Sequence, residues 1–557
     1  MNIGNIIRKY KTCLFLSAIL LLALFIRLYR LNSIPANFHE DEVLAGYVGR
    51  FILQNGRDLY GNHWPLLYFN KFGDFYIIWP IYLSGIATYF FGINEFATRF
   101  PAAFFGALAV IPVFFLTLWI FRNRTVALLA AFFMAISPWN IVLSRSTTEG
   151  IIGSTILLSG ILLTIQGIRK QKITYVLTGS ALCLITYFIY HPFRLYIPLV
   201  FLINFILFYK VKVQKKFALA YLSFFLFFIV ATLYISTTSW GKGRFIQTSI
   251  FSPLSGVSRI QHDLIADEKN GHILVSRIFH NKAVVYGREF LRQFFSYFSP
   301  NYLFIDGWQK TRYVVPDMGL FYLTWFFFLA VALIPRKNDQ QISVDKTLLA
   351  YTILLVAVAI IPAALTVVES PNLNRTSFMG YILVTFFAYG LYKSRQFTYK
   401  KLPLLTIGLC VTMGIEMIYF WHQYSKHFDF FSSMVRNDGQ KQLALYARSK
   451  EKNYEEIQLP AEGAMSWYYL FYSQDFNPNY AGKFKLDARI TRTNKVHYIE
   501  SSCPATELTT DELKKNRNLL VVNRYWCIED DRFIQIGDIR GANPLLGYKL
   551  LVPIPIK

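Results

Sequence analysis

The chain has 557 residues, of which 54% are hydrophobic and only 16% are charged. A soluble protein of this length needs more charge on its surface, so the composition indicates a membrane protein with many spanning segments. The formal net charge is +24, but the lysines and arginines stand in short clusters between apolar runs, where they act as topology signals. The sequence therefore argues against nucleic acid as a partner.

The first apolar run covers residues 12–30 and follows the basic stretch RKYK. It is longer than the apolar part of a typical secretory signal, and no small-residue cleavage site follows it. About 20 apolar residues are enough to cross a bilayer. We therefore expect a retained first span rather than a cleaved signal.

Residues 39–42 read HEDE, and apolar residues then recur at helical spacing from Glu40 to Gln54, with Gly56 placed to end the helix. This pattern predicts an amphipathic helix at the membrane interface. One acid in a first turn satisfies the helix dipole, a contribution of about 0.3–1 kcal/mol, and three acids exceed that need. We interpret Asp41 and Glu42 as functional, and leave His39 and Glu40 open between a structural and a functional role.

Twelve runs are long and apolar enough to be considered as spans. They lie near 12–30, 74–92, 100–121, 126–143, 151–168, 174–190, 194–209, 217–236, 318–335, 347–367, 377–393 and 403–421. Basic clusters flank them at 8–11, 122–124, 169–172, 210–216, 336–346 and 393–401. All six clusters face the cytoplasm, as the positive-inside rule requires, only if one crossing between the first two clusters is removed. We expect that run to be 74–92, which contains Pro80 and Gly85 and would lie along or re-enter the interface.

This assignment gives about eleven transmembrane helices, with the N-terminus in the cytoplasm and the C-terminus outside. The alternative is a twelve-span protein with one badly charged loop. The external segments are then 31–99, 144–150, 237–317, 368–376 and everything after 421. The functional surface is therefore expected on the external face.

Charged residues in these external loops outline a candidate site. Glu149 is either a helix-start residue or a second carboxylate that faces Asp41 across a cavity. External cations break the positive-inside trend, and a bound phosphate explains them, although snorkelling to lipid head groups explains any single one equally well. These cations are Lys71, Arg99, Arg194, Arg312 and Arg375.

After Trp421 the hydropathy falls and the pattern becomes that of a soluble domain. Short apolar runs predict strands at 454–459, 495–500, 518–523 and 532–539, and helices at 438–452 and 464–473. We expect two domains: a transmembrane catalytic domain, 1–421, and a small external α/β domain, 422–557. Cys503 and Cys527 share the second one, and a disulfide and two reduced cysteines are equally plain readings.

A series of short motifs carries a resemblance to a known family. In chain order they are DEVLAGY (41–47), ILQNGRDLYG (52–61), YFNK (68–71), FGINEFATRFPAAFFGALAV (91–110) and SPWNIVLSRSTTEG (137–150). Together they resemble the family-39 glycosyltransferases that use lipid-linked sugars, over roughly residues 12–400. That family includes the protein O-mannosyltransferases and the bacterial aminoarabinose transferase of lipid A, and has the GT-C architecture.

The resemblance implies an enzyme of the prokaryotic plasma membrane that takes a sugar from a polyprenyl phosphate, such as undecaprenyl phosphate, on the external face. At matching positions Asp41 is similar to the catalytic acid, with Glu42 beside it, and Glu149 stands where the family usually has a second-loop Asp. Lys71 matches a lysine that contacts the lipid phosphate. The other implied phosphate-binding residues are Arg99, which opens the second span, and two looser matches, Arg194 and Arg375.

Several points stay open. The first-loop signature of eukaryotic O-mannosyltransferases is absent, since the chain reads NHWPLLYFNKF, so the acceptor is left as a protein, a lipid or a glycan, and the region after Trp421 is a candidate for acceptor recognition. A divalent metal held by Asp41 and Glu149 and a metal-free site stabilised by Lys and Arg are equally good. The competing functions are a multispan transporter or lipid flippase and a non-catalytic sensor or scaffold.

Overall fold

The structure is a computed structural model of the chain, and it describes residues 3–71, 73–211, 214–251, 253–268, 273–307, 312–335, 342–398, 402–462, 464–482, 490–515 and 518–555. Within these ranges, side chains are not described for 3–9, 206–211, 243–244, 246–247, 253–259, 268, 273–274 and 515. The basic clusters at 210–216, 336–346 and 393–401 therefore lie partly outside the described residues, and in the cluster at 8–11 the side chains of residues 8 and 9 are not described.

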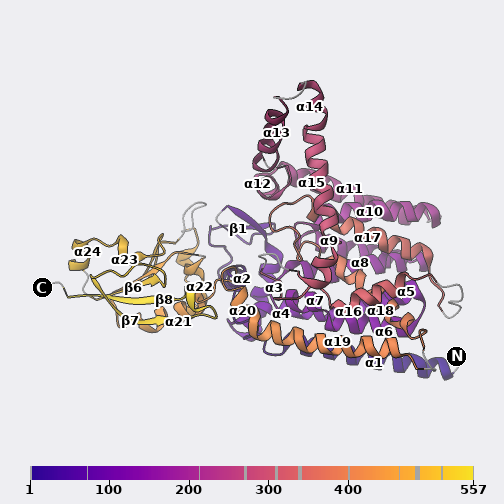
Figure 1. Cartoon of the computed structure of the whole chain (residues 1–557), viewed down its shortest axis with the longest axis horizontal. Helices are drawn as coiled ribbons and strands as arrows, with labels where there is room; N and C mark the ends of the chain where they lie inside the picture. Colours follow the sequence, from indigo (N-terminus) through magenta and orange to yellow (C-terminus); the bar gives the residue numbers. More distant parts are fainter. Residues whose placement is uncertain are drawn as a thin grey trace.

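Most helices pack side by side in one elongated bundle (Figure 1). They are α1 (Ile3–Leu28), α4 (Glu95–Leu108), α5 (Val110–Phe121), α6 (Arg124–Ile136), α7 (Pro138–Ser144), α8 (Glu149–Lys170), α9 (Ile173–Tyr187), α10 (Phe193–Val211), α11 (Lys215–Thr237), α16 (Leu323–Leu333), α17 (Lys346–Ala364), α18 (Ser377–Ser394) and α19 (Leu404–His422). Apart from 74–92, each apolar run expected from the sequence corresponds to one of these helices, or to two in the case of 100–121 (α4 and α5) and 126–143 (α6 and α7).

The length and apolar composition of each helix determine whether it can cross a bilayer. Among the described residues, six helical stretches are long and apolar enough, or seven if α6 and α7, bent by 50°, form one span. The six are Tyr10–Leu28, Glu95–Phe121, Glu149–Lys170, Lys215–Thr237, Lys346–Ala364 and Leu404–Phe431. Helices such as α9 and α16 are apolar but shorter. The chain is thus a polytopic membrane protein, and the expected number of eleven spans stays a prediction.

The segment 74–92 does not form a long helix. Strands β1 (Tyr68–Lys71) and β2 (Asp74–Ile77) form an antiparallel hairpin, and α3 (Ile78–Phe91) follows with only 14 residues. At 1.5 Å per residue this helix is shorter than a hydrocarbon core of about 30 Å. Its length therefore agrees with the expectation that the segment lies along or re-enters the interface.

Helix α2 (Glu40–Asn55) has the ends that the sequence predicts. His39 is the N-cap, and Gly56 follows the last turn with φ 67°, a left-handed conformation that glycine adopts without strain. The apolar face, however, is buried against protein: α2 packs on α3 so closely that a Cβ on Gly49 would lie 2.2 Å from the carbonyl oxygen of Ile81. The expectation that this face rests in lipid is therefore wrong.

Segment 237–317, which the sequence predicts to be a large external loop, is mostly helical in its described residues. It contains α12 (Ser239–Thr248), α13 (Pro253–Glu268), α14 (Ile273–Phe279), α15 (Lys282–Ser296) and a π-helical turn, Asn301–Ile305. In Figure 1 these helices project from the side of the bundle, and α15 runs across the direction of α1 and α19.

The chain leaves the bundle later than predicted. Helix α19 continues beyond Trp421 through a π-helical turn, Gln423–His427, into α20 (Phe428–Phe431). A sheet with helices follows at the opposite end of the molecule from the N-terminus (Figure 1). Its elements are α21 (Gln440–Lys450), β3 (Glu456–Pro460), α22 (Met465–Ser473), β4 (Arg492–Thr493), β5 (Val496–Ile499), α23 (Pro504–Glu507), α24 (Thr510–Lys515), β6 (Leu519–Arg524), β7 (Phe533–Ile539) and β8 (Tyr548–Pro553), with 3-10 turns at Pro478–Tyr480 and Pro544–Leu546.

The strand order is β4-β5-β3-β6-β8-β7. Strand β3 is parallel to β5 and β6, and the other pairs are antiparallel. The four predicted strands and both predicted helices are confirmed within about two residues at each end.

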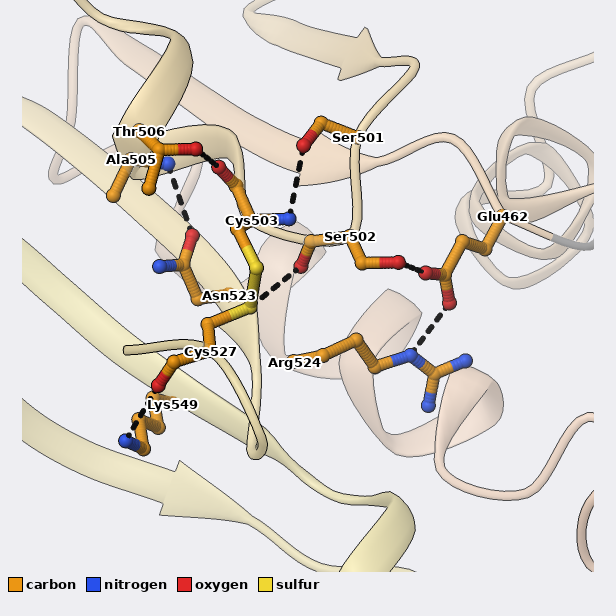
Figure 2. Close-up of a disulfide and its surroundings, with 10 residues drawn as sticks. All are labelled: Glu462, Ser501, Ser502, Cys503, Ala505, Thr506, Asn523, Arg524, Cys527 and Lys549. Carbon is orange, nitrogen blue, oxygen red and sulfur yellow. Dashed lines mark hydrogen bonds and ion pairs between the residues drawn. A yellow bond between two sulfur atoms is a disulfide. The ribbon is translucent and has the colours of Figure 1, made fainter. Parts of the chain in front are cut away.

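A disulfide joins Cys503 to Cys527, which settles the question that the sequence left open (Figure 2). It connects the loop after β5 to the loop after β6. Beside it, Arg524 Nε lies 2.6 Å from Glu462 Oε2, and Lys549 Nζ donates to the carbonyl oxygen of Cys527 at 3.2 Å.

The apolar core of the C-terminal region is not separate from that of the rest of the protein. Trp467 and Phe471 of α22 belong to one apolar cluster with Tyr47 and Phe51 of α2 and with Ile81 of α3. The predicted domain boundary at 421/422 therefore separates two regions that share one apolar core. Through this shared core, α22 of the C-terminal region packs against α2.

Candidate functional site

Asp41, in the first turn of α2, accepts hydrogen bonds on both carboxylate oxygens. Lys71 Nζ donates to Oδ1 at 2.6 Å, Tyr76 Oη donates to the same oxygen at 2.9 Å, and Arg312 Nη1 donates to Oδ2. Burial alone would raise the pKa of Asp41, but the charges of Lys71 and Arg312 outweigh it and hold the pKa well below its usual value. Asp41 is therefore a carboxylate at neutral pH.

The β1–β2 hairpin brings Lys71 and Tyr76 to this carboxylate. Lys71 ends β1, and Tyr76 lies on the paired strand opposite Phe69. Lys71 Nζ also donates to Glu40 Oε1 at 2.5 Å. Burial would lower the pKa of Lys71, but Asp41 and Glu40 raise it above its usual value. One lysine thus bridges two neighbouring carboxylates.

His39 has a structural role. Its Nδ1 accepts from the backbone N–H of Asp41 at 3.0 Å, and its own backbone N–H donates to Glu42 Oε2 at 3.0 Å, which is a capping box. Burial, followed by the positive charge of Arg312, lowers the pKa of His39 well below its usual value. A neutral His39 therefore starts the helix that carries Asp41.

Glu42 points away from Asp41 into a buried ionic network. It accepts from Arg99 Nε at 2.9 Å and from Arg436 Nη2 at 2.7 Å. Burial would raise the pKa of Glu42, but the two arginines lower it. The remaining N–H groups of the fully buried Arg99 donate to backbone carbonyls of Leu31, Pro35 and Asn37 and to Glu42. The prediction that Arg99 contacts a donor phosphate is therefore wrong in this structure, and Glu42 holds α2 in place.

A polar cavity opens beside Asp41. Besides Asp41 of α2, five separate parts of the chain contribute to its wall: β2, the start of α8, the loop before α10, the end of segment 237–317 and the loop between α17 and α18. The residues that line it are Asp41, Phe75, Tyr76, Ile77, Thr147, Glu149, Ile189, Tyr190, His191, Arg312, Tyr313, Glu369, Asn372, Asn374 and Arg375. The structure thus brings Asp41 and Glu149 to one cavity, which is the arrangement that the second reading of Glu149 requires.

The predicted cations divide into three groups. Lys71 contacts Asp41, and Arg375 lines the cavity while its Nη1 donates to Thr366 Oγ1 at 2.8 Å. Arg194 lies one layer behind the wall, with Nη1 3.2 Å from His191 Nδ1 and its guanidinium over the ring of Trp240. Arg99 lies outside the cavity.

The sequence did not single out several residues of the site. Arg312 was recognised as an external cation, but no motif connected it to Asp41. Tyr76, His191 and Glu369 had no signal of their own. Arg436 lies in the stretch after Trp421, which the hydropathy assigned to another domain, so its contact with Glu42 was not foreseeable.

The two proposed metal ligands, Asp41 and Glu149, do share the cavity. No group of three or more His, Cys, Asp or Glu side chains placed for a metal occurs among the described residues. Both oxygens of Asp41 already accept from cations. Lys71 and Arg312 thus place two positive charges on Asp41, and the choice between a divalent metal and a metal-free site stays as the sequence left it.

Comparison with known proteins identifies the fold. No protein-family model and no curated protein matches the chain. The structure of ArnT from Cupriavidus metallidurans bound to undecaprenyl phosphate is similar at a TM-score of 0.51 and 9% identity, over 98% of both chains. The apo ArnT structure gives a TM-score of 0.41 at 10% identity, over 98% of both chains.

The archaeal oligosaccharyltransferase AglB from Archaeoglobus fulgidus, in complex with an inhibitory peptide and a dolichol-phosphate, gives a TM-score of 0.47 at 11% identity, over 93% of this chain and 70% of that one. The similarity to lipid-bound ArnT shows that the chain has the same fold, which is the GT-C architecture expected from the sequence.

Proposed function

We propose that this protein is a membrane glycosyltransferase that moves a sugar from a polyprenyl-phosphate donor to an acceptor hydroxyl on the external face. The observation that carries the proposal is the position of Asp41, whose carboxylate lies between Lys71 and Arg312 at a polar cavity next to the membrane helices. The ArnT structure of the same fold is bound to undecaprenyl phosphate. Such a lipid stays in the bilayer, so its sugar must react at head-group depth, where α2 follows the first span.

The cations of the site suit a phosphate. Lys71 and Arg312 both reach Asp41, and Arg375 lines the same cavity. Guanidinium and ammonium groups form strong charge-assisted hydrogen bonds with phosphate oxygens. When the donor binds, its phosphate competes with Asp41 for Lys71 and Arg312, and these cations then stabilise the charge that grows on the departing phosphate.

The competition of the donor phosphate for Lys71 and Arg312 also allows Asp41 to act as the base. Without the donor, both of its oxygens accept from cations, and its lowered pKa makes it a poor proton acceptor. Transfer of the cations to the phosphate frees one oxygen to accept the proton of the acceptor hydroxyl. A bond then forms between the acceptor oxygen and C1 of the sugar, the bond from C1 to the phosphate oxygen breaks, and polyprenyl phosphate leaves. This single displacement inverts the anomeric carbon.

Glu149 and Glu42 have different parts in this reaction. Glu149 lines the cavity with Asp41 and can accept hydrogen bonds from sugar or acceptor hydroxyls. Glu42 is buried between Arg99 and Arg436 and keeps the first turn of α2 at its depth. We therefore assign proton transfer to Asp41, ligand orientation to Glu149 and positioning to Glu42.

The proposal includes a topology in the prokaryotic plasma membrane with the N-terminus in the cytoplasm and the C-terminal sheet outside. The Cys503–Cys527 disulfide supports this, since disulfides persist in oxidising compartments. Single cysteines at the exposed positions Trp64 and Ile528 should both react with a membrane-impermeant maleimide added to intact cells. Reaction only after the membrane is opened would contradict the topology.

The direct test is to incubate the purified protein with a panel of polyprenyl-phosphate hexoses and pentoses and with protein, lipid and glycan acceptors. We expect one donor to be consumed, with release of free polyprenyl phosphate, and no consumption by the Asp41→Asn variant. A transporter or flippase would instead move intact donor across a vesicle membrane with the sugar still attached. Consumption of no donor with any acceptor would count against the transferase.

A further inference from the structure

Helices α14 and α15 carry an unusual number of exposed apolar side chains for an external loop. Ile278 is 66% exposed, Phe279 62% and Phe295 63%, and Val284 and Leu291 are also exposed. On α15, Val284, Leu291 and Phe295 are separated by seven and four residues, so they form one stripe along the helix. We refer to α14 and α15 together as the lateral arm.

The opposite side of α15 anchors the arm to the bundle. Phe290 and Phe294 pack against the main apolar cluster, and Tyr297 Oη, just beyond the helix, accepts from the backbone N–H of Asn372 at 3.0 Å. Gln293 Oε1 accepts from Ser370 Oγ. The arm is thus attached through the loop that forms one wall of the polar cavity, while helical spacing places Leu291 and Phe295 of the stripe on the other side of α15 from Gln293.

The lateral arm is also strongly basic. Between Ile273 and Ser296 the chain has four cationic side chains, Arg277, Lys282, Arg288 and Arg292, and one acid, Glu289. All four cations are exposed. Arg288 lies in the apolar stripe itself, one turn before Leu291, and its long side chain can extend to a neighbouring layer of phosphates. An apolar stripe with basic residues around it is the pattern of helices that lie on a membrane surface.

The position of the arm agrees with this pattern. In Figure 1 the arm projects from the side of the bundle, and α15 runs across the direction of α1 and α19. Helix α11, which leads into this loop, exposes Leu226, Val230 and Leu233 as expected of a lipid-facing helix. The arm therefore lies at the side of the bundle, and the helix that leads into this loop also exposes apolar side chains.

We propose that the lateral arm lies in the head-group layer of the membrane and binds anionic lipid. Its apolar stripe contacts the upper acyl chains, and Arg277, Lys282, Arg288 and Arg292 contact lipid phosphates. Burying the stripe in lipid removes apolar surface from water, which is the favourable term in such contacts. Through Tyr297 and Gln293 the arm then holds the 370–372 loop at the level at which a lipid-linked donor presents its phosphate.

Fluorescence depth measurements test this placement without using sugar transfer. In a background with Cys13→Ser and Cys410→Ser, one cysteine at Phe295 carries an environment-sensitive fluorophore, and the protein is placed in nanodiscs of phosphatidylcholine and phosphatidylglycerol. The matched controls are Ile528→Cys, an 87% exposed apolar position on the C-terminal sheet, and Val230→Cys in α11. Quenchers are lipids spin-labelled near the head group and aqueous iodide.

We expect the probe at residue 295 to be quenched several-fold more by spin-labelled lipid, and several-fold less by iodide, than the probe at residue 528. Quenching at 295 that equals that at 528 would place the arm in water and overturn the proposal. Protection from both quenchers would show that protein covers the stripe, for example a second copy of the chain, and would overturn it as well.

The preference for anionic lipid has its own test. The probe at residue 295 is quenched in turn by spin-labelled phosphatidylglycerol and by spin-labelled phosphatidylcholine at equal mole fraction. We expect about twofold stronger quenching by phosphatidylglycerol, and loss of this difference in the variant Arg288→Gln/Arg292→Gln. Equal quenching by the two lipids in the unmodified arm would overturn the assignment of anionic lipid.

Discussion

Arg436 donates a hydrogen bond of 2.7 Å to Glu42, joining residues that are 394 positions apart in the chain. The same guanidinium donates to the carbonyl oxygen of Asn37 at 3.1 Å, and the arginine is fully buried. Because Glu42 stands next to Asp41 in the first turn of α2, a residue beyond the last membrane helix fixes the position of the proposed base. The C-terminal region is therefore part of the site as well as a candidate for acceptor recognition.

Replacing Arg436 tests whether its bond to Glu42 positions Asp41. Arg436→Gln should lower both the unfolding temperature and the rate of sugar transfer, because a buried carboxylate loses one of its two cationic partners. Breaking a buried ion pair costs about 3–5 kcal/mol, and the remaining Arg99 places the expected effect toward the lower end. Arg436→Lys should recover part of both properties. Thermal unfolding in detergent and a donor-consumption assay measure them.

Lys441→Gln is the matched control for Arg436. Lys441 Nζ also joins the C-terminal region to the bundle, at 2.5 Å from Glu95 Oε1, but this ion pair is with α4 and not with α2. We expect this variant to keep most of its transfer activity. If Lys441→Gln and Arg436→Gln lose activity to the same extent, the effect comes from joining the two regions and not from positioning Asp41.

Asp41→Asn should reduce transfer by about 10²–10⁴-fold, the range for loss of a general base, while the protein still inserts and folds. Glu40→Gln is the control, because Glu40 carries a neighbouring carboxylate on the same lysine, with Nζ to Oε1 2.5 Å. We expect less than a tenfold decrease for Glu40→Gln. Initial rates at saturating donor compare the two, and an active Asp41→Asn enzyme would remove Asp41 as the base.

Arg312→Gln and Lys71→Met should raise KM for the donor more than KM for the acceptor, because both cations are proposed to take up the donor phosphate. Arg194→Gln provides the contrast, since Arg194 lies behind His191 and not in the cavity wall. Its donor KM should change less than those of the other two variants. If KM for the donor is unchanged in both Arg312→Gln and Lys71→Met, these residues do not contact the donor phosphate.

His39 predicts a specific dependence of stability on pH. Its pKa is well below the usual value of about 6.5. Between these two values the unfolded chain binds a proton at His39 and the folded chain does not, so the free energy of unfolding should fall as pH decreases below about 6.5, by at most about 1.4 kcal/mol per pH unit. Asp41 and Glu42, with lowered pKa values, remain charged in this range.

His39→Asn keeps a side chain that can cap α2 but removes the titration. Its unfolding temperature should fall less than that of the unmodified protein between pH 7.5 and 5.5. His63→Asn, at an exposed position, serves as the control and should behave like the unmodified protein. If the unfolding temperature depends on pH in the same way in His39→Asn and in the unmodified protein, His39 does not titrate as expected.

Local patterns predicted much of this structure. The spacing of apolar residues from Glu40 to Gln54 and the glycine at 56 fixed α2 to within one residue, because caps and periodicity are properties of neighbouring residues. Four of the six strands of the C-terminal sheet followed from short apolar runs in the same way, whereas β4 and β8 were not predicted. Asp41 could be singled out because three successive acids exceed what a helix end requires.

The errors concern contacts between distant segments. An apolar stripe such as that of Val43, Tyr47 and Phe51 has the same sequence whether lipid or protein covers it, so the packing of α2 on α3 and α22 could not be read from the pattern. Arg99 looked like other external cations, and only the fold shows that Glu42 and three carbonyl oxygens use its N–H groups. Arg312 and Arg436 contact the first turn of α2 from distant segments, and no sequence motif links those segments to α2.

The core shared by α2 and α22 has a consequence for biosynthesis. Synthesis runs from N- to C-terminus, so residues 39–42 are made well before Arg436 and before the side chains of α22 that cover α2. The site is thus closed by contacts between segments that are far apart in the sequence, and these contacts cannot form before residue 436 has been made. A chain truncated before residue 436 would reach the membrane with its apolar α2 surface uncovered. Such a chain would also lack the guanidinium that donates to Glu42 next to Asp41.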